Sequence, residues 1–164
     1  MKKFIATMIV SVGLLSGTNA WAEKATKESI WRSDYLLMVE QGLHALKSQR
    51  YDSAKEKLTE VAKLGNKQAQ YYLAQMYLQG WGAEPDYEEG WLWLSVAMEQ
   101  KTTEWNRSYK QIKGALPPEF ITAMQPFVDE HIALYGAKTQ DLRCEKRAAI
   151  GSHIKMVICE KRYY

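Results

Sequence analysis

Histidine residues are the first candidates for catalysis or metal binding in this chain. His44, His131 and His153 lie in three separate segments, and none has a second ligand residue at the short spacing typical of a metal site. The sequence contains no nucleophile elbow, phosphate-binding glycine loop or zinc-helix motif. We therefore expect a non-enzymatic protein without metal or cofactor. His44 and His131 are then most simply residues of a helix surface or of a packed cap.

Four carboxylates near the middle of the chain could act as paired acids and bases. Glu84, Asp86, Glu88 and Glu89 fall within six positions of one another. Asp86 is better explained as a helix N-cap, because an aspartate side chain can accept hydrogen bonds from the first free backbone N–H groups of a helix. The glutamates then lie at or near a helix start, where the dipole favours negative charge.

The two cysteines, Cys144 and Cys159, could form either a redox pair or a structural bond. Catalytic pairs usually lie two residues apart at a helix start, whereas these are 15 residues apart. In an oxidising compartment we expect one intramolecular disulfide. Closing this loop would contribute about 3 kcal/mol on the chain-entropy model.

Aromatic side chains are the remaining candidates for ligand contact. Trp81 stands between Gly80 and Gly82 at an expected turn, where full burial is difficult. An exposed tryptophan there could anchor a peptide or stack on a sugar ring. The alternative is a tryptophan folded back over the junction of two repeats, since tryptophan is highly buried on average. Seven aromatic residues crowd into 23 positions of this region: Tyr71, Tyr72, Tyr77, Trp81, Tyr87, Trp91 and Trp93.

The elements that must position these side chains follow a helical period. Four segments repeat small or apolar residues at offsets of zero, four, seven and eight, which places each set on one helical face. The first and third sets are 31 residues apart and the second and fourth 36, a period typical of stacked helix pairs. The sets are Met38/Gly42/Ala45/Leu46, Ala54/Leu58/Val61/Ala62, Ala69/Leu73/Met76/Tyr77 and Gly90/Leu94/Ala97/Met98.

Glycine, asparagine and proline mark where these helices begin and end. Gly65-Asn66 and Gly80-Trp81-Gly82 are expected to end helices, and Pro85-Asp86 to begin one. Gly90 lies inside an expected helix, where it costs about 1 kcal/mol relative to alanine, so we expect a close helix contact there. Leucine at this position should be destabilising. Alanine should be neutral or stabilising if the backbone is ordinary.

Residues 66–101 carry one small, apolar, aromatic and turn pattern at Ala69, Leu73, Tyr77, Gly80, Gly82, Asp86, Trp93 and Ala97. Through these residues the segment resembles the Sel1-like repeat, a relative of the tetratricopeptide repeat with a longer glycine-bearing turn. The resemblance implies an all-α fold, a short solenoid of stacked helix pairs that binds partners rather than catalysing reactions. Residues 33–65 look more like a tetratricopeptide unit, through Gly42, Tyr51, Ala54 and Leu58. Two positions depart from the family pattern, which usually has valine at Ala83 and alanine at Gly90.

Residues 102–137 are expected to form helices that cap the stack. Thr103 could cap the first. The run Leu116-Pro117-Pro118-Glu119 separates it from the second, which has proline at a first-turn position and continues to about Tyr135. We expect one face of the second helix to pack, namely the face that carries Phe120, Ala123, Phe127 and His131 or Ile132.

Residues 138–164 change to a period of two and should form a basic, hairpin-like tail closed by the disulfide. Ile154, Met156 and Ile158 alternate with Lys155, Val157 and Cys159 in one expected strand. Residues 142–147 are a possible partner strand. The tail carries seven Lys and Arg against three Asp and Glu, whereas residues 23–137 carry 13 against 16.

The first 22 residues have the order of a signal peptide. A basic start, an apolar run over residues 4–15 and Ala20-Trp21-Ala22 predict cleavage before Glu23. We expect a periplasmic or secreted protein with no transmembrane segment in its mature chain. Loss of Lys2 and Lys3 leaves 20 Lys and Arg against 19 Asp and Glu, a balance that gives no support for nucleic-acid binding.

Together these patterns predict a non-enzymatic interaction or scaffold module of the cell envelope. Its repeat domain would span residues 23–137, followed by the tail at 138–164. The expected partner is a protein or peptide. The alternative is an envelope-surface binder, in which the basic tail contacts anionic polymer or lipid headgroups and the aromatic residues contact glycan.

Overall fold

A computed structural model of the chain describes residues 32–148 and 153–162. They belong to one compact unit, residues 31–164. The predicted signal peptide and its Ala22–Glu23 cleavage site lie outside the described residues. The elements are α2 (Arg32–Lys47), α3 (Tyr51–Lys63), α4 (Lys67–Gln79), α5 (Tyr87–Ala97), α6 (Thr103–Ala115), α7 (Pro118–Tyr135), β1 (Leu142–Ala148) and β2 (Lys155–Lys161).

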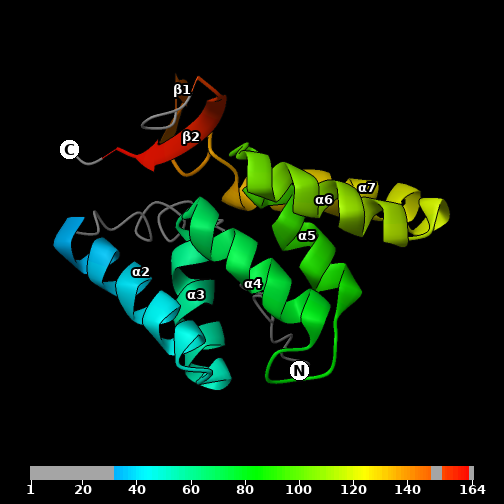
Figure 1. Cartoon of the computed structure of the whole chain (residues 1–164), viewed down its shortest axis with the longest axis horizontal. Helices are drawn as coiled ribbons and strands as arrows, with labels where there is room; N and C mark the ends of the chain where they lie inside the picture. Colours follow the sequence, from blue (N-terminus) through cyan, green and yellow to red (C-terminus); the bar gives the residue numbers. More distant parts are fainter. Residues whose placement is uncertain (1–31, 149–152, 163–164) are drawn as a thin grey trace, which may run out of the picture. The chain divides into compact units, whose positions relative to one another are not determined.

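The helices of the repeat region pack as antiparallel neighbours in chain order (Figure 1). Helix α2 packs against α3, α3 against α4, and α4 against α5, and α7 then joins the stack through α5. The predicted all-α stack of helix pairs is confirmed. Its short loops keep each helix beside the next one in the chain.

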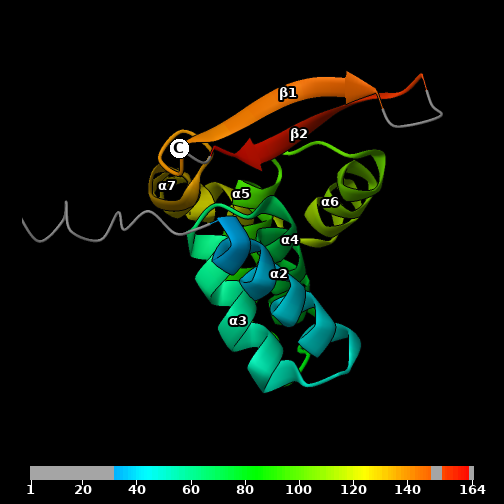
Figure 2. The same cartoon turned by 90° about the vertical axis from the view of Figure 1, so that its left-hand side faces the viewer.

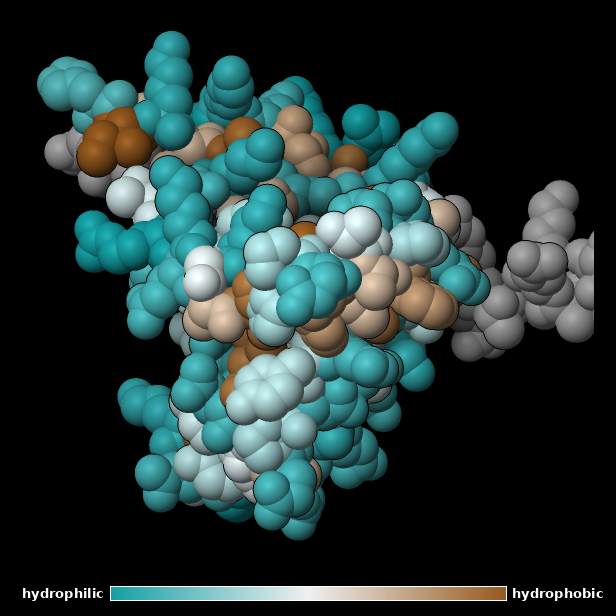
Figure 3. All heavy atoms as spheres, turned by 90° about the vertical axis from the view of Figure 1, so that its right-hand side faces the viewer, coloured by the Kyte–Doolittle hydropathy of each residue, from teal (hydrophilic) through white to brown (hydrophobic). Residues whose placement is uncertain are grey.

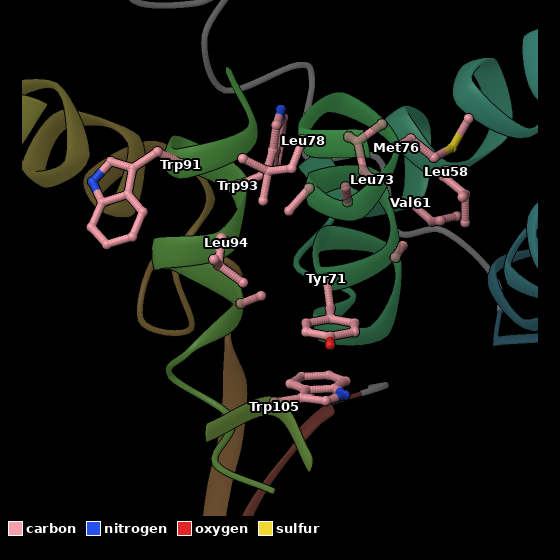
Figure 4. Packing of buried hydrophobic residues seen from close by; sticks show 14 of the residues in the cluster. Leu58, Val61, Tyr71, Leu73, Met76, Leu78, Trp91, Trp93, Leu94 and Trp105 are labelled. Atoms are coloured by element: carbon pink, nitrogen blue, oxygen red, sulfur yellow. The ribbon is translucent and has the colours of Figure 1, made fainter. Parts of the chain in front are cut away.

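The core lies on the faces that the helical period predicts. Every residue of the four repeated sets is buried or half-buried, and Leu58, Leu73 and Leu94 are fully buried. Figure 4 shows these side chains between the helices. It also shows Tyr71 of α4 lying face to face with Trp105 of α6, with ring centroids 4.6 Å apart and planes at 3°.

The turns form by the expected chemistry, with one difference. Gly80 ends α4 at a φ of 67°, and the Asp86 carboxylate accepts a hydrogen bond from the Glu89 backbone N–H over 3.0 Å. Asp86 is therefore an N-cap. Asn66, expected to help end α3, instead caps the start of α4, because its side-chain oxygen accepts from the Ala69 N–H over 2.8 Å.

The expected close contact at Gly90 is present. A Cβ atom on this buried glycine would lie 2.6 Å from Cγ of Leu78 in α4. That distance is too short for two carbon atoms, so the expectation that alanine would be neutral or stabilising does not hold. The helix conformation would tolerate alanine, but the neighbouring helix would not.

The last two helices differ from the expectation: α6 has a different N-cap residue, and α7 buries a different face. The N-cap of α6 is Thr102 rather than Thr103, and its hydroxyl accepts from the Trp105 N–H over 3.1 Å. In α7 the buried residues are Met124 and Val128, whereas Phe127 of the predicted face is 57% exposed. Helices α6 and α7 lie apart, with α5 between them (Figure 2), so each reaches the stack separately.

The tail forms the predicted antiparallel hairpin, in which Cys144 lies opposite Cys159 and is bonded to it. The hairpin also hydrogen-bonds to the helical part, including through the Cys159 N–H, which donates to Gln100 Oε1 over 3.1 Å. Val157 pairs with Lys101 through two backbone hydrogen bonds of 3.0 and 3.1 Å. At its other end, Lys161 Nζ donates to the Leu64 carbonyl over 2.8 Å.

Candidate binding surfaces

A buried lysine ties the start of α4 to the end of α5 and to the segment that follows α7. Lys67 Nζ donates to Glu99 Oε2 over 2.6 Å and to the Val96 carbonyl over 3.2 Å, with its side chain only 1% exposed. The same Glu99 oxygen accepts from the Ala137 N–H over 2.7 Å. Burial lowers the pKa of Lys67, and the adjacent Glu99 carboxylate partly restores it. The Lys67 amine and the Glu99 carboxylate thus hold α4, α5 and the segment after α7 together.

Gln70 completes the polar network from one turn further along α4. Its Oε1 accepts from Lys67 Nζ over 2.9 Å, and its Nε2 donates to the Ala62 and Tyr135 carbonyls over 2.9 and 3.0 Å. The C-terminal ends of α3 and α7 are thus joined through one fully buried side chain. Sequence reasoning missed this network, because a lysine and a glutamine near a helix start usually lie in solvent.

His131 belongs to an aromatic cluster rather than to a catalytic group. Its ring lies edge-on to Trp93 and Tyr135, at centroid distances of 4.4 and 4.8 Å. Burial lowers its pKa to about 4, so the imidazole is neutral at physiological pH. Its buried Nε2 has no hydrogen-bond partner within the described residues. The histidine therefore packs α7 onto α5.

Trp81 combines a fixed position with partial exposure. Its ring stacks on Tyr51 of α3 at a centroid distance of 6.3 Å, yet the residue remains 38% exposed. The neighbouring Gly82 has a φ of 84° and lies against Tyr51, where a Cβ atom would be 2.5 Å from the tyrosine Cβ. Trp81 is therefore folded back onto α3 and remains partly exposed to solvent.

The cations of the hairpin are partly neutralised by its own acids. Arg147 makes hydrogen bonds of 2.8 and 2.9 Å to the two Glu160 oxygens, and Arg143 contacts Glu145 over 2.6 Å. Side-chain hydrogen bonds from the arginines lower the pKa of Glu145. Arg162 lies 3.9 Å from Asp141, so all three acids of the tail have an arginine beside them. This pairing weakens the tail as a polyanion site.

A surface hollow of about 600 Å³ lies between the end of α5 and α6. Met98 and Tyr109 contribute its apolar residues, and Lys101, Lys110 and Lys113 its charged ones. Figure 3 shows the end of the molecule at which the turn from α6 to α7 lies, with patches of brown apolar surface among teal hydrophilic side chains. The sequence did not single out this hollow, since its residues come from two segments.

The described residues contain no group of three or more His, Cys, Asp or Glu placed to hold a metal ion. Over the same residues, no helix has both the length and the apolar character needed to cross a bilayer.

The fold has a counterpart among solved structures. A crystal structure of a protective antigen present in uropathogenic Escherichia coli strains, which displays an SLR (Sel1-like repeat) fold, superposes with a TM-score of 0.55. The chain has the Sel1-like repeat fold. The match covers 79% of this chain at 19% sequence identity, but only 29% of the antigen's own chain. No protein-family model and no curated protein matches the sequence.

The residues that suggested a Sel1-like repeat occupy consistent places. Ala69, Leu73, Trp93 and Ala97 are buried in α4 and α5, and Tyr77 is half-buried. Burial and the charges of Glu89 and Asp86 raise the pKa of the Tyr77 hydroxyl. In this Sel1-like fold these signature residues pack the helix pair.

Proposed function

We propose that the protein is an exported, non-enzymatic interaction module that binds a protein or peptide in the cell envelope. The Sel1-like repeat fold supports this, because stacked helix pairs offer extended surfaces for partners. The disulfide and the predicted signal peptide support export, since disulfides persist in oxidising compartments. Residues 33–65 and 66–101 would be its repeats, residues 102–137 its capping helices and residues 138–164 its tail.

Trp81 is the observation that carries the proposal. A tryptophan held by stacking on Tyr51 keeps few rotamers, so binding through its exposed part costs little conformational entropy. Tryptophan is also among the residue types most enriched at binding hot spots. Trp81 is then a rigid anchor on the turn that joins α4 and α5.

The test is capture of an envelope partner by the full-length, disulfide-bonded protein and by Trp81→Ala. Phe127→Ala is the matched control, because Phe127 is an exposed aromatic residue on a different helix. We expect Trp81→Ala to weaken capture at least thirtyfold, as for a hot spot of about 2 kcal/mol, while helical circular dichroism is unchanged.

Equal capture by both variants would contradict the anchor. If capture depended on salt and on the hairpin cations instead, the alternative binder of anionic polymer, lipid headgroups or glycan would replace the proposal. Contacts to a polyanion weaken steeply as salt rises.

A further inference from the structure

The hollow between α5 and α6 has an apolar floor held in place from below. Tyr109 of α6 stacks on Trp91 of α5 with ring centroids 5.5 Å apart and planes at 18°. Trp91 is only 3% exposed and belongs to the core, whereas Tyr109 and Met98 are half-buried at the surface. The floor is therefore a fixed surface on which a bulky apolar side chain could pack.

The rim of this hollow carries uncompensated positive charge. Lys101, Lys110 and Lys113 are exposed, and no carboxylate pairs with them in the part of the chain that the structure describes. Lys113 Nζ lies 6.0 Å from the centre of the Tyr109 ring, which places a cation directly beside the floor.

The acid that lines the hollow is already satisfied. Glu99 uses its Oε2 atom for Lys67 Nζ and for the Ala137 N–H, so its charge is compensated from inside the protein. Helix α6 has one acidic residue, Glu104, which is exposed in the first turn and does not line the hollow. The net field over the hollow is therefore positive.

The hairpin extends this positive region. Lys146 of β1 lies opposite Val157 of β2, and Val157 pairs on its other edge with Lys101. Directly paired residues of antiparallel strands place their side chains on the same face, so Lys146 and Lys101 share a face of the hairpin. An elongated ligand that extended from the hollow along this face of the hairpin would meet a further cation at Lys146.

We propose that the hollow between α5 and α6 binds an acidic peptide segment that carries one bulky apolar residue. The apolar residue would pack on Met98 and Tyr109, and flanking carboxylates would reach Lys101, Lys110 and Lys113. This assignment rests on the proposed function, because it names the chemistry of the partner and a second contact area beside Trp81. A binding energy divided between apolar burial and charge pairing distinguishes such a segment from a simple polyanion.

The test uses fluorescence anisotropy with a labelled probe of alternating glutamate and serine around a single central phenylalanine. Two further probes replace the phenylalanine by glycine or the glutamates by lysine. We expect the first probe to bind the mature, disulfide-bonded protein, and both other probes to bind at least tenfold more weakly.

Paired variants locate the site. Lys110→Gln/Lys113→Gln should weaken binding of the first probe about tenfold, because two charge contacts are lost. The matched control is Lys47→Gln/Lys63→Gln, which removes exposed lysines from the last turns of α2 and α3. The control should bind as tightly as the unchanged protein.

Two results with the variants would overturn the proposal: an equal loss of affinity for the first probe in both double variants, or no loss in either. Equal affinity for the probe without phenylalanine would also overturn it, as would tighter binding of phosphatidylglycerol vesicles through the same lysines. None of these results decides the proposed function, which is tested separately by capture with Trp81→Ala. Suppose that an envelope partner is captured through Trp81 and that Lys110→Gln/Lys113→Gln captures it equally well. The proposed peptide site in the hollow would then be wrong, while the proposed interaction module would stand.

Discussion

Gly90 of α5 and Leu78 of α4 approach each other so closely that a Cβ atom on the glycine would lie 2.6 Å from Cγ and 2.7 Å from Cδ2 of the leucine. The contact joins the two helices of the second repeat. Because Leu78 is itself buried, it has little room to move away. The spacing of this helix pair therefore depends on the absence of one methyl group.

We expect Gly90→Ala to lower the melting temperature. Overpacking a core typically costs about 1–3 kcal/mol, and over most of this range the cost outweighs the gain of about 1 kcal/mol from replacing glycine in a helix. Gly114→Ala is the control, because a Cβ on this glycine of α6 would meet nothing within 4 Å. It should raise the melting temperature. Thermal unfolding followed by circular dichroism distinguishes the two, and a rise in both would disprove the close contact.

Glu99→Gln should destabilise the protein by about 3 kcal/mol, because it leaves the charge of Lys67 buried without its partner. Glu145→Gln, which breaks exposed contacts to Arg143 and Arg147, should cost less than about 1 kcal/mol. Urea unfolding measures both. Similar losses in the two variants would show that the Lys67 contact contributes no more than a surface pair.

The stability of the protein should fall in mild acid because of His131. Its pKa is about 4 in the folded chain and 6.5 when unperturbed, so the unfolded state binds the proton more readily. The contribution of neutral His131 to the free energy of unfolding is therefore fully present above about pH 6.5 and is lost as the pH falls towards 4. His131→Phe should flatten the melting temperature across this window, whereas His153→Asn, at an exposed position, should not. An unchanged slope in His131→Phe would contradict this.

Removing the disulfide should loosen the hairpin more than the helices. Cys144→Ser/Cys159→Ser deletes a loop closure worth about 3 kcal/mol on the chain-entropy model. Hydrogen exchange should accelerate most at the amides of β1 and β2. Equal acceleration in α3 and α4 would show that the bond stabilises the whole unit.

We expect processing after Ala22, because the first residues have the charged, apolar and small-residue order of a signal peptide. Intact-mass measurement of protein recovered from a soluble envelope fraction should give Glu23 as the first residue. Recovery of the uncut chain there would oppose the prediction.

The helices of the repeats were predictable because their buried residues follow one period and their ends carry glycine, asparagine or aspartate. The buried face of α7 could not be predicted in this way. Apolar residues occur around much of this helix, including Phe127 and Met124, so periodicity alone leaves its rotation open. Packing against α5 selects the face with Met124 and Val128.

The contacts that join distant segments were also outside the reach of sequence patterns. Lys67 lies in a polar run at a helix start, and its burial depends on a glutamate 32 residues later. The pairing of Val157 with Lys101 uses backbone atoms, which every residue has. For the same reason the hollow between α5 and α6 emerged only from the structure.

The docking of the hairpin changes how this short solenoid should unfold. A linear stack of repeats holds only nearest-neighbour contacts, so its terminal units can fray independently. Here Lys161 bonds the Leu64 carbonyl 97 residues earlier in the chain, and Val157 bonds Lys101. The hairpin is thereby joined to the turn between α3 and α4 and to the segment that follows α5. Separation of the hairpin must break contacts at both of these places, so the molecule should melt in a single cooperative transition rather than repeat by repeat.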